Sequence, residues 1–344
     1  MSDKVSVVFH EVFNCGYYKH GATAPSFGGL AELLLDLETW SAGKSLANTQ
    51  ISSSAAGHSL PIYLLSMESF NGAVLLTMWN EVPATADNQV TSVAANDLVG
   101  SVTQHMNGIV QGTIPGFPTY FLFLPNVGAF ATLRVEGLIT AQPPFQKYCE
   151  QFLATQSSYC VQLPPNPSSP AAVVTYGYRP TPRDQVEAKV RPRFRTRLFS
   201  KPAITAEIIR RWDDVYKIER RADITFKTPD ERALWQKALG VMKKGWAPSS
   251  TPNKAHVTTS LTTSLTRAEV VSLINDWSQQ AQTTDWDDYG FKFKGETSTH
   301  WLSKSGARGE VVLNGIRAAD GTVATSALLR AIMGHQSYLT GLLT

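Results

Sequence analysis

The segment KVRPRFRTRLF, residues 189–199, alternates basic side chains with other types over nine positions. A repeat of two places successive side chains on opposite faces of an extended chain, so the segment predicts a β-strand. Its cationic face, called here the basic row, consists of Lys189, Arg191, Arg193, Arg195 and Arg197. Phe194 should point to the opposite, buried face. Pro192 cannot donate a ladder hydrogen bond, and we therefore expect this strand at a sheet edge.

Charge is distributed unevenly along the chain. The 344 residues have a net charge of only +3, and 43% of them are hydrophobic, as in globular proteins. Residues 1–178 hold 5 basic and 11 acidic side chains, whereas residues 179–254 hold 19 basic and 9 acidic ones. Residues 255–344 are nearly balanced, with 7 basic and 8 acidic. Such a concentration of positive charge favours a nucleic-acid or anionic-membrane partner.

The order of strand and helix signals predicts an α+β fold with two domains of mixed or antiparallel sheets and packed helices. Hairpins are expected at Asn71-Gly72 and at Asn126-Val127-Gly128. The stretch LPPNPSSPAA, residues 163–172, has the Pro- and Ser-rich composition of a linker. We therefore expect an acidic domain over residues 1–163, a linker or crossing segment over 164–178, and a basic DNA-binding domain with the basic edge strand over 179–344.

Several helices and strands are expected from periodicity and capping signals. Ser92 to Met106 is predicted to be helical, and a final helix is expected from Thr325. A second amphipathic helix is predicted from an apolar stripe of Ile204, Ile208, Trp212, Val215 and Ile218, with Arg210, Arg211, Arg220 and Arg221 on its other face. Capping boxes at Thr228–Glu231 and Thr266–Glu269 indicate two further helix starts. Short strands are expected at 255–262, 289–294, 299–303 and 309–314.

The basic row matches a polyanion. An extended row spans about 26 Å with ~6.6 Å between neighbouring side chains, and DNA phosphates follow each strand at a rise of about 3.4 Å. The simpler explanation is a charged edge that prevents aggregation, for which one or two lysines suffice. The candidate DNA-binding residues are the basic row, Lys201, Arg210, Arg211, Arg220, Arg221, Lys243 and Lys244. For Lys243 and Lys244, a helix end capped by Gly245 is the simpler explanation.

Signals of enzymatic chemistry are weak. Asp184, Glu187 and Lys189 superficially resemble the acid-acid-lysine site of metal-dependent nucleases, but all three fall within one short stretch. The sequence contains no dinucleotide, Walker or GxSxG motif, and its three cysteines form no zinc pattern. We expect no catalytic residue, no metal and no cofactor. Without an export signal or an apolar run of about 20 residues, a cytoplasmic location is expected.

Three segments, in the same order, resemble the RexA family of prophage-encoded phage-exclusion proteins. They are IPGFPTYFLFLPNVGAFATLRVEG from Ile114, VRPRFRTRLF from Val190 and STHWLSKSGARGEVVLN, which ends at Asn314. The family has a Gly-Phe-Pro strand followed by a strand with Phe-Ala, and a strand of the form apolar-basic-Pro-basic-Phe-basic. None of these motifs is catalytic.

The resemblance implies a dimeric, two-domain α+β protein that binds duplex DNA with little sequence preference. It also implies an intracellular sensor that signals to a membrane channel partner when another phage infects a lysogen. Arg191, Arg193 and Arg195 correspond to the basic strand of that family, with arginine in place of most of its lysines.

The expected function is therefore non-sequence-specific binding of double-stranded DNA within a phage-exclusion, or superinfection immunity, system. Two alternatives stay open, namely a metal-dependent nuclease that acts on phage nucleic acid and a non-enzymatic protein-interaction module. A homodimer is expected, and the C-terminal stripe of Leu328, Leu329, Ile332, Leu339 and Leu342 either forms its interface or lines the core.

Overall fold

The structure is a computed structural model that describes residues 2–51, 61–83, 91–105, 110–135, 141–163, 174–225, 254–279 and 288–343. The strands and helices of these ranges form an α+β fold, as predicted. They belong to two compact units, called here unit 1 (Met1–Phe199 with Ala307–Thr344) and unit 2 (Ser200–Gly306). Within the described ranges, no helix is long and apolar enough to cross a membrane.

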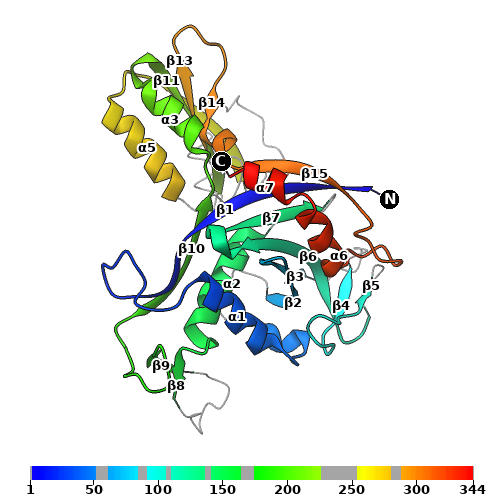
Figure 1. The fold of residues 1–344 in the computed structure, drawn as a ribbon. Coiled ribbons are helices and arrows are strands. Elements are labelled where there is room, and N and C mark those ends of the chain that lie inside the picture. The colour runs from blue at the N-terminus through cyan, green and yellow to red at the C-terminus, as the bar shows by residue number, and fades with distance from the viewer. Residues whose placement is uncertain are drawn as a thin grey trace, which may run out of the picture. The chain divides into compact units, whose positions relative to one another are not determined.

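Unit 1 is built on an antiparallel sheet with the strand order β10-β1-β7-β6-β3-β2 (Figure 1). These strands are β1 (Ser2–Tyr18), β2 (Ile62–Phe70), β3 (Ala73–Glu81), β6 (Thr113–Leu124), β7 (Ala129–Val135) and β10 (Arg191–Leu198). β4 (Ser92–Ala94) pairs with β6 and with β5 (Gln104–His105), and β15 (Arg308–Asn314) pairs with β1. A separate two-stranded sheet joins β8 (Cys160–Gln162) and β9 (Thr175–Tyr178).

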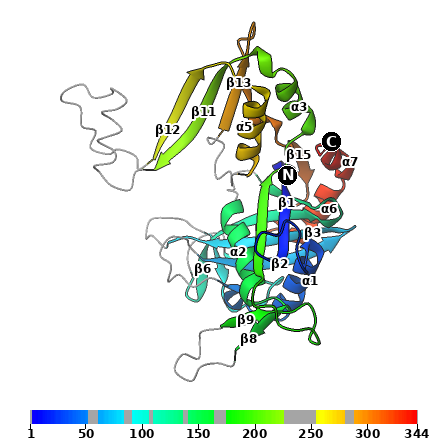
Figure 2. The ribbon, with the colours of Figure 1, turned by 90° about the vertical axis from the view of Figure 1, so that its left-hand side faces the viewer.

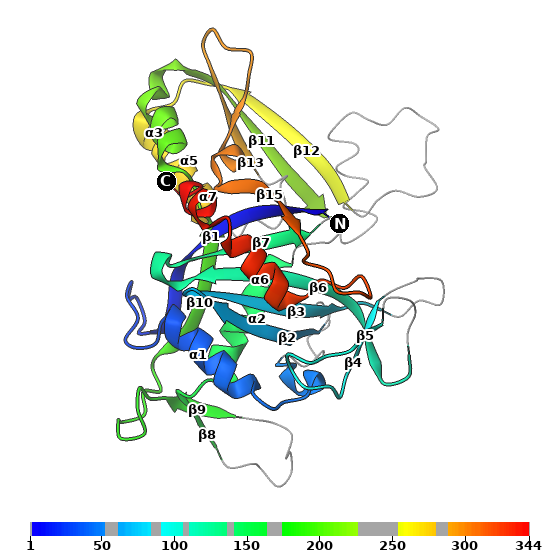
Figure 3. The same cartoon turned by 45° about the vertical axis from the view of Figure 1, so that its right-hand side comes forward.

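Helices cover both faces of this sheet (Figure 3). α1 (Leu30–Ser41) and α2 (Gln142–Thr155) pack on one face, and α6 (Thr325–Met333) and α7 (Gln336–Gly341) pack on the other. Short 3₁₀ turns form η1 (Leu46–Thr49) and η3 (Pro125–Val127). Successive residues of β6 therefore enter opposite cores, with Leu122 towards α6 and Phe121 towards α2. Burial on both faces explains why the central strands are apolar at nearly every position.

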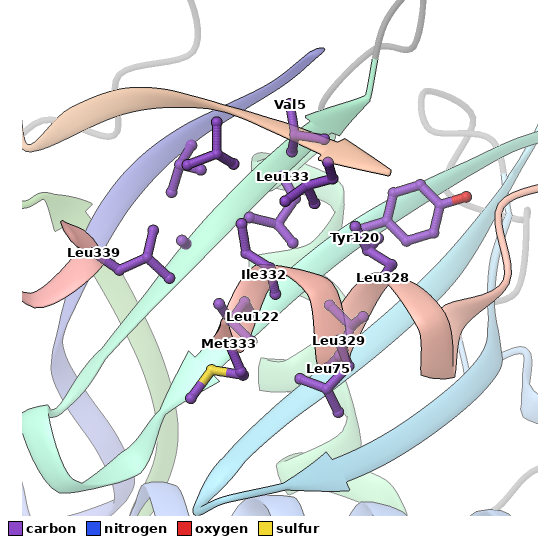
Figure 4. Close-up of a cluster of buried hydrophobic side chains, with 14 of the residues drawn as sticks. Val5, Leu75, Tyr120, Leu122, Leu133, Leu328, Leu329, Ile332, Met333 and Leu339 are labelled. Atoms are coloured by element: carbon purple, nitrogen blue, oxygen red, sulfur yellow. The ribbon is translucent and has the colours of Figure 1, made fainter. Parts of the chain in front are cut away.

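The apolar stripe of the C-terminal helices lies in the core of unit 1. Leu328, Leu329 and Ile332 pack against residues of β1, β6 and β7 (Figure 4). Each is at most 2% exposed, so the stripe has no area left for a second subunit. Of the two roles considered for it, the stripe therefore lines the core, and the expected homodimer stays a prediction that needs another surface.

Both expected hairpins are confirmed. Asn71 and Gly72 have φ of 51° and 77° and connect Phe70 directly to Ala73, which is the left-handed geometry of a tight two-residue turn. Gly128 has a φ of 66° and follows the 3₁₀ turn between β6 and β7. These turns hold the central strands in consecutive antiparallel order.

One edge of the sheet is formed by two strands that lie end to end. β10 pairs with His10–Tyr18 of β1, and β15 pairs with Ser2–Val8. β7 pairs with Val5–Glu11, so it occupies one side of β1, and β10 and β15 share the other side. β10 and β15 therefore pair with successive halves of the same edge of β1.

The chain departs to unit 2 after Phe199 and returns at Ala307, and both residues are hydrogen-bonded at the same place on β1. The backbone N–H of Phe9 donates to the carbonyl of Ala307 at 2.8 Å, and the N–H of Phe199 donates to the carbonyl of Phe9 at 2.9 Å. A further bond from the N–H of Ala307 to the carbonyl of Phe199, at 2.6 Å, closes the gap. Unit 2 is thus an insertion within an otherwise continuous edge strand.

In its described residues, unit 2 has a four-stranded antiparallel sheet and two α-helices that pack on each other (Figure 2). The strand order is β12-β11-β13-β14, with β11 (Val215–Thr225), β12 (Lys254–Thr262), β13 (Asp288–Phe293) and β14 (His300–Trp301). Its other elements are α3 (Pro202–Arg210), α5 (Arg267–Gln279), η4 (Trp212–Asp214) and η5 (Leu302–Ser305). The capping box at the start of α5 is confirmed, because Thr266 N–H donates to Glu269 Oε2 at 2.7 Å and Glu269 N–H donates to Thr266 Oγ1 at 3.3 Å.

Two of the predicted helices are wrong. Residues 92–105 contain β4 and β5, where Val93 packs with Trp79 and Asp97 accepts a bond from the N–H of Thr103. The helix predicted up to Ile218 ends at Arg210, and β11 follows. β11 is hydrogen-bonded to a strand on each side. These two ladders stabilise the extended conformation more than the apolar stripe favours a helix, because the β-branched residues of the stripe have a low helix propensity. The capping box at Thr228 lies outside the described residues.

The division of the chain differs from the expected one. The boundary was expected over residues 164–178, but the basic edge strand and everything from Ala307 onward belong to unit 1. The cause is non-local, because β1 supplies the ladder for both β10 and β15. The later elements agree with expectation in position, since β12, β13, β15 and α6 lie within one residue of the predicted strands and helix start. The strand predicted at 299–303 is shorter, because β14 spans only His300–Trp301.

Deletion of residues 200–307 should leave unit 1 folded. Phe199 then takes the position opposite Phe9 and is followed by Arg308, whose partner is Val8, so the register of both halves is preserved. We expect a cooperative thermal transition and a strand-rich circular dichroism spectrum.

Deletion of residues 200–306 provides the matched control. It retains Ala307 as one extra residue, which shifts β15 by one position and turns its core-facing side chains outward unless a bulge absorbs the residue. The control should therefore melt at a lower temperature. Equal melting of the two variants would contradict the continuous-strand description.

His10 should make stability depend on pH. Burial, with a smaller effect of Arg308, lowers the pKa of His10 from 6.5 to about 4. Between these values the unfolded chain binds more protons than the folded one, so stability should fall as the pH drops from about 6.5 to 4, by up to about 3 kcal/mol. His10→Phe keeps a ring stacked on Phe130 and should flatten this dependence in urea titrations at pH 7 and 4.5. If the variant loses as much stability between pH 7 and pH 4.5 as the parent does, another titrating group causes the pH dependence.

Candidate nucleic-acid interface

The basic row lies on β10, the terminal strand of the unit 1 sheet. Its predicted alternation is confirmed, because Phe194 is fully buried while Arg191 and Arg195 on the other face are exposed. The predicted edge position is also confirmed, with Pro192 opposite Tyr17 of β1. Lys189 precedes the strand in an exposed turn.

Two arginines of the row are held by carboxylates. Arg195 makes a two-pronged contact with Glu150 of α2, with both nitrogen–oxygen distances at 3.1 Å. Arg197 Nε lies 2.7 Å from Oε2 of Glu11, its cross-strand neighbour. These pairs are partly exposed and each contributes only about 0–1 kcal/mol to stability. Each carboxylate nevertheless cancels a charge that an incoming phosphate would otherwise meet.

Side chains of α2 also cover the outer edge of β10 in its C-terminal half, which carries Arg195 and Arg197. The backbone N–H of Thr196 donates to Gln146 Oε1 at 3.0 Å, and its hydroxyl donates to the same oxygen at 2.7 Å. Gln142 Nε2 donates to the Thr196 hydroxyl from the preceding turn of the helix. Because these side chains occupy the polar groups of the strand, this part of the edge is protected from pairing with another chain.

The other half of the row is open. Among the described residues, Lys189, Arg191 and Arg193 have no carboxylate partner. The guanidinium of Arg193 lies over the ring of Tyr18, 5.2 Å from its centroid, which holds the cation in place without neutralising it.

Neighbouring segments add cations to this open half. The resulting surface, called here the basic tip, consists of Lys19, Arg179, Arg183, Lys189, Arg191 and Arg193. Backbone bonds between Tyr178 and Glu187 join these segments, and Glu187 reaches Lys19 Nζ at 3.4 Å. Asp184, the other carboxylate in these segments, accepts a hydrogen bond from Thr181. These segments therefore hold six cations and two carboxylates, and the basic tip has a net positive charge.

An aromatic cluster adjoins the basic tip. Tyr17 stacks on Phe27 with ring centroids 4.8 Å apart, and its ring also contacts Tyr159 at 5.3 Å and Tyr178 at 4.7 Å. Burial, with a smaller effect of Cys160, raises the pKa of Tyr178 to about 12, so this phenol adds no negative charge at neutral pH. Tyr176, two residues before Tyr178, is 60% exposed.

The candidate residues of unit 2 are not gathered on one helix face. Arg210 pairs with Glu207 at 2.7 Å, and Arg211 pairs with Glu296 at 2.7 Å while lying over the ring of Phe293. Arg220 and Arg221 lie on β11, where their guanidinium groups stack on the rings of Tyr289 and Trp301. The cationic helix face predicted from these residues is therefore wrong, because α3 ends before Arg220. Lys201 precedes α3 and is half-buried.

The remaining candidates receive no support from the structure. Lys243 and Lys244 lie outside the described residues. Asp184 and Glu187 are occupied by Thr181 and Lys19, and no group of three His, Cys, Asp or Glu within the described ranges could hold a metal ion. The nuclease alternative therefore gains no site in this part of the chain.

Comparisons with known proteins identify no family. No family model matches the chain, and no curated protein sequence matches it. The resemblance to the RexA family therefore stays a hypothesis based on the three sequence segments.

Sequence reasoning missed the acidic partners and the aromatic cluster. Glu11 lies 186 residues from Arg197, and Glu150 lies 45 residues from Arg195, so no local sequence pattern predicts either ion pair. Tyr17 and Tyr18 end the first strand, and only the position of β10 beside them gives them a role at the basic tip.

Gln146→Leu should destabilise unit 1 by about 1–3 kcal/mol, since it leaves the Thr196 N–H and hydroxyl without their acceptor. The change can be measured as a lower urea midpoint. Gln151→Leu is the matched control on the same helix and should have a smaller effect. Equal stability of the two variants would mean that Gln146 does not cap the edge.

Proposed function

We propose that this protein is a non-enzymatic nucleic-acid-binding protein that contacts backbone phosphates through the basic tip, without reading base sequence. The observation that carries the proposal is the split of the basic row. Arg195 and Arg197 are neutralised by carboxylates, whereas Lys189, Arg191 and Arg193 are presented to solvent beside three further cations. Protection of the edge against aggregation does not call for six cations at one end of the strand.

The spacing of the row supports phosphate as the ligand. Side chains two positions apart on a strand are separated by about 6.6 Å, close to two rises of ~3.4 Å along a nucleic-acid strand. Arginine forks bind phosphate oxygens through paired hydrogen bonds. Contacts of this kind fix the position of the backbone and carry no base identity, so binding should be nearly independent of sequence.

The biological setting is the second part of the proposal and rests on the resemblance alone. It comprises binding of double-stranded DNA as a cytoplasmic homodimer, a sensor role in a prophage-encoded phage-exclusion system and a membrane channel partner. Of the two alternatives, a metal-dependent nuclease predicts degradation of nucleic acid that depends on metal, and a protein-interaction module predicts no binding of nucleic acid at any salt concentration.

Replacement of Lys189, Arg191 and Arg193 by Gln should weaken binding by orders of magnitude at moderate salt. For the parent, log affinity against log salt should have a slope of about −3 to −5 on duplex DNA, and the variant should be shallower by about 2.7, or 0.9 for each lost phosphate contact. Fluorescence anisotropy with two unrelated labelled duplexes measures both quantities. Replacement of Lys4, Arg267 and Arg330 by Gln removes the same charge elsewhere and should have little effect. Equal losses of affinity in the two variants would mean that binding depends on the net charge of the protein and not on the basic tip.

Neutralisation of the acidic partners should have the opposite effect. Glu11→Gln with Glu150→Gln releases Arg197 and Arg195 for phosphate contact, so affinity should rise about tenfold or more and the salt slope should steepen by up to about 1.8. Glu38→Gln with Asp276→Asn changes the net charge equally at exposed positions and serves as the control. If both pairs raise affinity alike, the carboxylates do not mask the row.

A further inference from the structure

The basic tip and the aromatic cluster lie on opposite faces of one two-stranded ribbon. β7 pairs with β1 only as far as Glu11, so the rest of β1 continues with β10 as its ladder partner. Cross-strand neighbours share a face, which places Arg191 with Tyr18 and Pro192 with Tyr17. Because successive residues alternate, the ring of Tyr17 and its aromatic neighbours lie on the face opposite the arginines.

The aromatic side of the ribbon is held firmly and is partly open. The Tyr17 hydroxyl donates to the carbonyl of Leu153 at 2.6 Å, and the backbone of Phe27 pairs with Tyr17. Phe27 and Tyr178 are only half-buried, so their rings retain exposed area.

Tyr176 lies on β9, two residues before Tyr178, and its side chain is exposed to solvent. In the β8–β9 ladder Gly177 faces Val161 and Thr175 faces Gln162, which leaves Tyr176 as the extra residue of a bulge. The bulge leaves Tyr176 without a cross-strand partner, and its side chain is 60% exposed.

We infer that the basic tip takes single-stranded nucleic acid in preference to duplex, with bases stacked on the partly exposed rings of Phe27 and Tyr178 and on the exposed ring of Tyr176. This inference rests on the proposed function. A ligand that uses both faces must turn around the edge of β10 within the width of a strand. Duplex DNA, with a persistence length of about 150 base pairs, does not bend over that distance, whereas a single strand does and has free base faces to stack.

The small number of unpaired cations on the row also favours a single-stranded ligand. Since Arg195 and Arg197 are held, the open part of the row is limited to residues 189–193 and meets few phosphates. Sequence-tolerant single-strand binders combine such a limited basic track with aromatic stacking.

The test compares a labelled 20-nucleotide oligothymidine with a labelled 20-base-pair duplex, using the full chain and anisotropy at several salt concentrations. The single strand should bind at least tenfold more tightly. Tyr176→Ala should weaken single-strand binding by about 5- to 150-fold and leave duplex binding unchanged. Tyr176→Phe should restore the parent affinity, and Tyr338→Ala, which removes an exposed tyrosine from α7, should have no effect.

The outcomes separate this inference from the proposed function. Duplex binding equal to or tighter than single-strand binding overturns the inference and leaves the proposed function intact. An equal effect of Tyr176→Ala on both ligands also overturns it. Failure to bind either ligand at low salt overturns both.

Discussion

The backbone ladder along β1 is the interaction on which the rest of the structure depends. This 17-residue strand pairs with β7 on one side and with β10 and β15 in succession on the other. It places the basic row at an edge, fixes where unit 2 is inserted, and continues past β7 to form the ribbon that carries the basic tip. Loss of this ladder would remove the fold and the candidate interface together.

Features that depend on neighbours in the sequence were predictable. The left-handed turn at Asn71-Gly72 needs residues that tolerate positive φ, and the capping box at Thr266 is complete within four residues. The alternation around Phe194 likewise determines which side chains of β10 face the core.

Features that depend on distant partners were not predictable. Val215 and Ile218 fit a helical stripe, and only the two ladders of β11 decide that they lie on a strand. The continuity of β10 with β15 is set by the shared strand β1, and the neutralisation of Arg197 is set by Glu11. A row of cations in a sequence therefore states how much charge is present, but not how much of it is available.

The pairing of the first strand with one of the last has a consequence for synthesis. Ser2–Val8 meets its outer partner only when Arg308–Asn314 has been made, about 300 residues later. At translation rates of about 5–20 residues per second, that half of the edge remains without its partner for roughly 15–60 s. During this interval β1 presents unpaired backbone groups and the apolar side chains of Val5 and Val7, a surface that chaperones bind. The insertion of unit 2 supplies 107 of these residues, so a segment outside the unit 1 sheet adds about a third of the time for which the first strand stays exposed.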